Sequence, residues 1–165
     1  MLIDTSKSKI YIKSFNPNKE IPFFFIHGFT GSSSSWFQVI NKLDKYSYSI
    51  DIPGHGKSTF KSLDDFYTVS DWCNEFYMLL QQLSIQKIDI CGYSMGGRLA
   101  IAFASKYPEK INSMVLESTT VGLNETKERR ECYDKDSQIS STIKTDLSSF
   151  VDLWEKNPLF LKQKE

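Results

Sequence analysis

Segments typical of buried strands recur along the first two thirds of the chain. Residues 21–26 are apolar throughout, as in a strand that is covered on both faces of a parallel sheet. The segments 46–51, 87–91 and 111–116 predict three more strands of the same kind. A shorter β-branched and aromatic run at 10–12, followed by Asn-Pro-Asn, predicts an edge strand that turns into the domain.

Apolar residues at helical spacing lie between these strands. They mark one helix over 36–43 and a longer one over 66–83, for which Thr68 and Asp71 form the expected capping box. A further helix follows Ser94. Strands that alternate with helices imply right-handed βαβ units. The predicted fold class is therefore α/β, a mostly parallel sheet with helices on both faces.

The pattern changes beyond Glu117. Residues 118–149 are polar and charged, and apolar side chains return from Phe150 onward without a strand pattern. We therefore expect residues 1–117 to form an α/β core and residues 118–165 to form part of a helical cap over a site. The two parts make one incomplete domain, because the later βα units that would cover one sheet edge are not readable.

The composition narrows the class of partner. Twenty basic and twenty acidic residues cancel and are spread along the chain, which predicts a small-molecule partner and no nucleic acid or membrane. Three cysteines without a C-x-x-C pair, and two histidines, support neither disulfides nor a metal site, and no cofactor is expected. With no signal-like N-terminus and no run near the roughly 18 apolar residues of a membrane span, we expect a cytoplasmic protein.

The strongest chemical motif is Gly92-Tyr93-Ser94-Met95-Gly96, which joins a predicted strand to a predicted helix. This context is typical of a nucleophile elbow, in which the tight turn excludes side chains beside the serine backbone. Ser94 is therefore the predicted catalytic residue. The Met95 amide would lie at the positive end of the helix, where it can stabilise an oxyanion, and the Phe29 amide would supply the second donor.

A serine of this kind is activated by a histidine that an acid orients, and in this fold both follow the serine along the chain. The histidines of this sequence are His27 and His55, which both precede Ser94. We interpret His27 as a packed residue that shapes the oxyanion loop and His55 as a residue that fixes its own loop. Asp51 also precedes Ser94 and is not expected to be the triad acid. The chain is thus predicted to be a truncated or split gene product that is inactive alone.

Several motifs together resemble those of the 2-succinyl-6-hydroxy-2,4-cyclohexadiene-1-carboxylate synthases of menaquinone biosynthesis, a branch of the α/β-hydrolase superfamily. In chain order they are His27-Gly28-Phe29-Thr30-Gly31, Asp51-Ile52-Pro53-Gly54-His55-Gly56-Lys57-Ser58, Gly92-Tyr93-Ser94-Met95-Gly96-Gly97-Arg98, Leu116-Glu117-Ser118-Thr119, Glu128-Arg129-Arg130 and Trp154-Glu155-Lys156-Asn157-Pro158-Leu159-Phe160. The resemblance spans nearly the whole chain but only about the N-terminal 60% of a family member.

The resemblance implies a carbon–oxygen lyase. In this family the serine, made basic by its histidine, removes a ring proton from 2-succinyl-5-enolpyruvyl-6-hydroxy-3-cyclohexene-1-carboxylate, and pyruvate is eliminated. A substrate with several carboxylates calls for fixed guanidinium groups. The residues that the resemblance assigns to substrate binding are Tyr93, Arg98, Arg129, Trp154 and Phe160. Asn124 departs from the family, which often has Gln at that position.

Other readings stay open at this point. A generic serine esterase or thioesterase would share the elbow and the oxyanion loop without needing Arg98 or Arg129. A non-catalytic fragment is the third reading. For the single residues, Arg98 can be an ordinary surface residue of its helix, and the aromatic rings of Trp154 and Phe160 can form the core of the cap.

Overall fold

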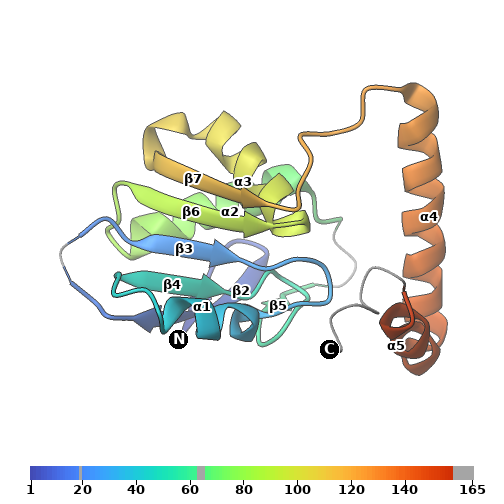
Figure 1. The fold of residues 1–165 in the computed structure, drawn as a ribbon, viewed down its shortest axis with the longest axis horizontal. Coiled ribbons are helices and arrows are strands. Elements are labelled where there is room, and N and C mark those ends of the chain that lie inside the picture. Colours follow the sequence, from blue (N-terminus) through green and yellow to red (C-terminus); the bar gives the residue numbers. More distant parts are fainter. Residues whose placement is uncertain (19, 63–65, 158–165) are drawn as a thin grey trace. The chain divides into compact units, whose positions relative to one another are not determined.

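The computed structural model describes residues 1–18, 20–62 and 66–157 (Figure 1). The chain forms two compact units, Met1–Val121 and Gly122–Glu165. Phe160, one of the predicted substrate-binding residues, lies outside the described residues.

The first unit is built on one mixed sheet, whose described strands follow the order β1-β2-β4-β3-β6-β7, with β5 paired to β2. The strands are β1 (Leu2–Asp4), β2 (Ser8–Phe15), β3 (Phe23–Ile26), β4 (Ser47–Ile50), β5 (Thr59–Phe60), β6 (Ile88–Tyr93) and β7 (Ile111–Glu117). Strands β4, β3, β6 and β7 are parallel, which confirms the predicted α/β class. Strands β1, β2 and β5 add antiparallel pairs.

The prediction of an edge strand at 10–12 is wrong. Strand β2 lies between β1 and β4, and both of its neighbours pair with it in antiparallel register. The strand that covers it, β1, has only three residues, too few to show a two-residue alternation. One edge of the sheet is therefore β1. The opposite edge is β7, which Figure 1 shows beside β6.

The two faces of the sheet carry different helices, α2 (Val69–Gln82) and α3 (Met95–Lys106) on one and α1 (Phe37–Ile40) on the other. Alternating side chains of β3 reach the two layers. Phe24 and Ile26 join the larger core, to which α2 and α3 contribute. Phe25 joins the smaller core, which includes residues of α1 and of the 3-10 turn before it. The predicted helix over 36–43 is thus a 3-10 turn, Ser33–Trp36, followed by the single turn of α1.

The start of α2 confirms the capping box. The Asp71 amide donates to Thr68 Oγ1 at 3.0 Å, and the Thr68 amide donates to Asp71 Oδ2 at 2.8 Å. The helix therefore begins at Val69. Phe66, which the sequence pattern placed in the helix, precedes it and is 85% exposed.

Between residues 122 and 157, the second unit contains the helices α4 (Thr126–Thr145) and α5 (Leu147–Glu155). No residue of α4 is buried, whereas α5 buries Phe150. Asp146 ends α4 and caps α5 by accepting a hydrogen bond from the Ser149 amide at 3.0 Å. Across the described residues, no helix has the length and apolar character that a membrane span requires.

Candidate active site

Ser94 lies at the sharp turn between β6 and α3. Its backbone has φ 52° and ψ −113°, a conformation that L residues rarely adopt and that is typical of strained functional positions. Its side chain makes no capping hydrogen bond to α3. The hydroxyl is therefore not used by the helix that begins at the next residue.

Glycines make this turn possible. A Cβ on Gly92 would lie 2.5 Å from the Gly97 Cα, and a Cβ on Gly96 would lie 2.4 Å from the Ile26 carbonyl oxygen. Both distances are shorter than any side chain tolerates next to backbone atoms. The elbow thus packs directly against the end of β3, as its predicted role requires.

The predicted oxyanion donors come from two segments that meet at Ser94. Met95 is the first residue of α3, where helix amides have no intrahelical acceptor. A Cβ on Gly28 would lie 3.4 Å from Ser94 Cβ and 2.9 Å from Tyr93 Cδ1, which places the loop of Phe29 beside the elbow. The assignment of the Met95 and Phe29 amides as oxyanion donors stays a prediction.

His27 is held by hydrogen bonds on both ring nitrogens. The Ile52 amide donates to Nε2 at 3.1 Å, so Nδ1 carries the proton and donates to the Gly28 carbonyl at 2.7 Å. Burial lowers the pKa of His27, whose side chain is 1% exposed, and favours the neutral ring. The ring thus ties the loop after β3 to the loop after β4, and neither nitrogen is free to serve Ser94.

Both carboxylate oxygens of Asp51 also accept hydrogen bonds from the surrounding loops. Its Oδ1 accepts a hydrogen bond from the Ser33 amide at 2.5 Å and its Oδ2 accepts one from the Lys57 amide at 2.8 Å. The ring of His55 lies 5.1 Å from the His27 ring and 6.1 Å from the Phe29 ring. These contacts fit the interpretation of His55 as a residue that fixes its own loop, and the structure gives Asp51 a similar role.

The end of β7 and the residues that follow it also hold the elbow, which the sequence did not predict. The Ser94 amide donates to the Glu117 carbonyl at 2.9 Å, and Thr119 Oγ1 donates to the Ser94 carbonyl at 2.7 Å. The sequence feature that could have indicated this contact is Gly97, which directly follows Gly96. A Cβ there would lie 2.7 Å from Thr119 Cβ.

The predicted substrate-binding residues fall in both units. Tyr93 is half-buried beside Gly28, and Arg98 is exposed one turn into α3, with its amide donating to the Ser94 carbonyl at 3.2 Å. Phe29, Tyr93, Ser94 and Met95 are thus brought together in the first unit, with Arg98 close by. No three His, Cys, Asp or Glu side chains gather as a metal site would require in the part of the chain that the structure describes.

Arg129 and Trp154 belong to the second unit. Arg129 Nη2 donates to the Asn124 carbonyl at 2.9 Å. The Trp154 ring lies 5.5 Å from the Phe150 ring, and both line a groove of about 360 Å³ between α4 and α5. Packing within this unit is therefore one role that the structure gives to Trp154.

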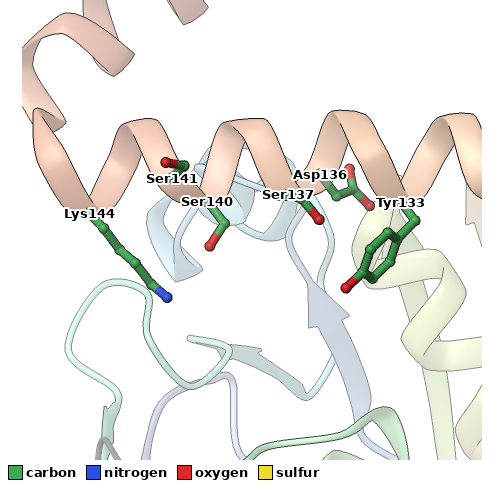
Figure 2. A pocket seen from close by; sticks show the side chains of 6 residues that line it. All are labelled: Tyr133, Asp136, Ser137, Ser140, Ser141 and Lys144. Carbon is green, nitrogen blue, oxygen red and sulfur yellow. The ribbon is translucent and has the colours of Figure 1, made fainter.

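A polar row runs along α4, as Figure 2 shows. Its residues follow one another at helical spacing and line a second pocket: Tyr133, Asp136, Ser137, Ser140, Ser141 and Lys144. None of them is a predicted site residue.

A mostly parallel sheet with a strained serine between a strand and a helix, beside the loop that follows an earlier strand, defines the α/β-hydrolase class of fold. The chain belongs to the α/β-hydrolase fold family, whose model matches residues 21–162.

The chain is also similar to proteins with a specific name. It is 40% identical over 149 residues to a Bacillus subtilis (strain 168) protein provisionally named 2-succinyl-6-hydroxy-2,4-cyclohexadiene-1-carboxylate synthase, a match covering 89% of this chain and 54% of the relative. An Enterobacter sp. (strain 638) protein of the same name is 29% identical, with 86% and 54% covered. The chain thus spans about half the length of the curated relatives it matches.

The fold of the chain is also similar to that of solved structures. MenH from S. aureus superposes with a TM-score of 0.83 at 29% identity, covering 97% of this chain and 60% of that one. A thermophilic esterase from Thermogutta terrifontis superposes with a TM-score of 0.78 at 19% identity, covering 92% and 56%, which shows the shared fold alone.

Proposed function

We propose that this chain contributes the catalytic serine to a 2-succinyl-6-hydroxy-2,4-cyclohexadiene-1-carboxylate synthase site, which eliminates pyruvate from 2-succinyl-5-enolpyruvyl-6-hydroxy-3-cyclohexene-1-carboxylate. The observation that carries the proposal is the strained Ser94 elbow, in a chain that is 40% identical to a Bacillus subtilis protein provisionally given that name. Its partner is then a small polycarboxylate.

The chemistry assigns Ser94 the role of a base. A histidine takes the Ser94 hydroxyl proton, the oxygen removes a proton from the substrate ring, a ring double bond forms, and the carbon–oxygen bond between the ring and the enolpyruvyl group breaks. The enolpyruvate that leaves takes up one proton at its methylene carbon and becomes pyruvate, which balances the proton removed from the ring. The Met95 and Phe29 amides stabilise negative charge as it develops. Both ring nitrogens of His27 are hydrogen-bonded to the loops, and His27 and His55 both precede Ser94, whereas the histidine of this fold follows its serine. The histidine in this proposal therefore comes from outside these 165 residues.

Arg98 is proposed to bind a substrate carboxylate. It is exposed, it lies one helical turn from Ser94, and a guanidinium binds carboxylates with two parallel hydrogen bonds. Tyr93, Arg129, Trp154 and Phe160 are proposed as further substrate contacts. Among these, Tyr93 is supported by its position beside the oxyanion loop.

The test is pyruvate release by this chain extended with the segment of the Bacillus subtilis relative that has no counterpart here. We expect the Arg98→Ala variant of the extended protein to turn over substrate about 10- to 100-fold more slowly, since a charge-assisted contact is worth about 1.5–3 kcal/mol. Lys106→Ala, which removes a positive charge from the same helix, is the matched control and keeps the parent rate. A parent-like rate from Arg98→Ala would contradict the carboxylate contact.

A serine esterase is the second candidate, supported by the strained Ser94 elbow, which both kinds of enzyme would use. It needs the elbow and the oxyanion loop but no carboxylate-binding arginine. Hydrolysis of p-nitrophenyl acetate by the extended protein, unchanged in Arg98→Ala and without pyruvate release, would favour the esterase over the lyase.

A further inference from the structure

The backbone of Ser94 is held on both sides by residues 117–119, which are the last residue of β7 and the two residues that follow it. Its amide donates to the Glu117 carbonyl at 2.9 Å, and its carbonyl accepts from Thr119 Oγ1 at 2.7 Å. Between these two contacts, Ser118 has φ 49°, a left-handed conformation that turns the chain back toward the elbow. Residues 117–119 therefore make hydrogen bonds to the peptide groups on both sides of Ser94, whose φ is 52°.

The Thr119 contact falls where α3 begins. The Ser94 carbonyl also accepts from the Gly97 amide at 3.1 Å and the Arg98 amide at 3.2 Å, the first hydrogen bonds of the helix. A third donor at the same oxygen fixes the direction of that peptide group. It thereby fixes the Ser94 side chain against the helix N-terminus, where the Met95 amide lies.

Gly97 provides the room for this contact. A Cβ at Gly97 would lie 2.7 Å from both Thr119 Cβ and Cγ2, so a larger residue would push the threonine away. Gly97 thus leaves room for Thr119, just as Gly96 leaves room for the end of β3.

We propose that Thr119 is a positioning residue, which keeps the Ser94 side chain at the α3 N-terminus through its hydrogen bond to the Ser94 carbonyl. The inference rests on the proposed function in taking Ser94 as the reacting residue. Without the hydroxyl, residue 94 can leave its strained conformation, and its side chain then moves away from the helix amides that stabilise a negative charge.

A thiol at position 94 reports this geometry without any catalytic histidine. A cysteine at a helix N-terminus has a lowered pKa, and its alkylation rate follows the thiolate fraction. The background variant of the 165-residue chain is Ser94→Cys with Cys132→Ser. The remaining thiols are buried, and burial raises the pKa of Cys73 and raises that of Cys91 to about 11. The iodoacetamide rate is then measured against pH.

In this background we expect Thr119→Val to move the midpoint of the pH profile upward and to slow alkylation at pH 7 about fivefold, because thiolates away from a helix N-terminus have ordinary pKa values. Thr119→Ser, which keeps the hydroxyl, restores the parent profile. Thr120→Val, the same change at the exposed neighbouring threonine, leaves the profile unchanged.

A Thr119→Val profile equal to that of the parent overturns the proposal, even if the variant is less stable. If Thr119→Val does not fold by circular dichroism, Thr119→Ala takes its place, and parent-like alkylation by that variant overturns the proposal equally. Failure of the proposed function is distinguishable, because it would appear as absent pyruvate release by the extended protein while the thiol profiles keep the expected order.

Discussion

At the residue scale, Glu75 of α2 is a charged group that the fold has enclosed completely. Its carboxylate accepts hydrogen bonds from Thr5 Oγ1 at 2.8 Å, the Ser8 amide at 3.0 Å, Ser8 Oγ at 2.7 Å and the Tyr67 hydroxyl at 2.8 Å. Burial alone would raise the pKa of Glu75, but these hydrogen bonds, first among them that of Ser8, leave it below its ordinary value. The carboxylate ties the turn between β1 and β2 to the helix layer.

Replacing Glu75 with Gln should destabilise the first unit by about 3 kcal/mol, because donors arranged for a carboxylate are left buried without a full acceptor. Urea unfolding at pH 7 measures the loss. Glu109→Gln, an exposed charge, is the control and should change the free energy of unfolding by less than about 0.5 kcal/mol.

The same carboxylate gives the stability a pH dependence. Since the folded pKa lies below the unfolded value near 4.5, its contribution is complete above that pH and is lost as the pH falls through the folded pKa. Unfolding of the parent between about pH 5 and 2.5 should show this loss, and Glu75→Gln should remove that part of the slope. An unchanged slope in the variant would show that Glu75 is not the group responsible.

At the scale of elements, the elbow depends on how closely α3 approaches β3. Gly96→Ala should destabilise the first unit by about 3 kcal/mol or prevent folding, since the added Cβ would lie 2.4 Å from the Ile26 carbonyl oxygen and 2.5 Å from that of His27. Thermal unfolding measures the effect. Ser105→Ala on the exposed face of the same helix serves as the control, and equal stability of the two variants would mean that the close approach carries no cost.

The β7 edge is the second element with a testable consequence. It ends the described sheet and exposes Met114, Val115 and Leu116, and unpaired apolar edges favour association. We expect the 165-residue chain to self-associate with increasing concentration in sedimentation velocity, and Val115→Lys to reduce this association. Val39→Lys on α1, where the valine is 43% exposed against 50% for Val115, should not reduce it.

Elements with strong local signals were predictable. The capping box of Thr68 and Asp71 was predicted and marks the start of α2, although the apolar pattern extended the predicted helix back to Phe66. The glycines of the elbow predicted the strand-to-helix turn. The three-residue strand β1 gave no periodic signal, so β2 was wrongly predicted to be an edge strand. Pairing between short strands depends on partners distant in sequence, which a local pattern does not report.

At the scale of the whole molecule, some residues of the site are neighbours in the sequence, whereas others come together only when the chain folds. The elbow motif is contiguous, and its residues Tyr93, Ser94 and Met95 lie as one turn. The contact of Thr119 with the Ser94 carbonyl joins residues 25 positions apart, and it becomes visible only when β6 and β7 are paired. A single sequence does not reveal such contacts because their partners are chosen by packing.

The most direct test of the proposed site is pyruvate release by the extended protein, compared with that of its Ser94→Ala variant. If Ser94 is the base, the parent releases pyruvate from 2-succinyl-5-enolpyruvyl-6-hydroxy-3-cyclohexene-1-carboxylate and the variant is slower by about 10³-fold or more. The 165-residue chain alone, in which His27 is committed to the loops, gives the baseline. Equal rates from the parent and from Ser94→Ala would contradict the assignment of Ser94.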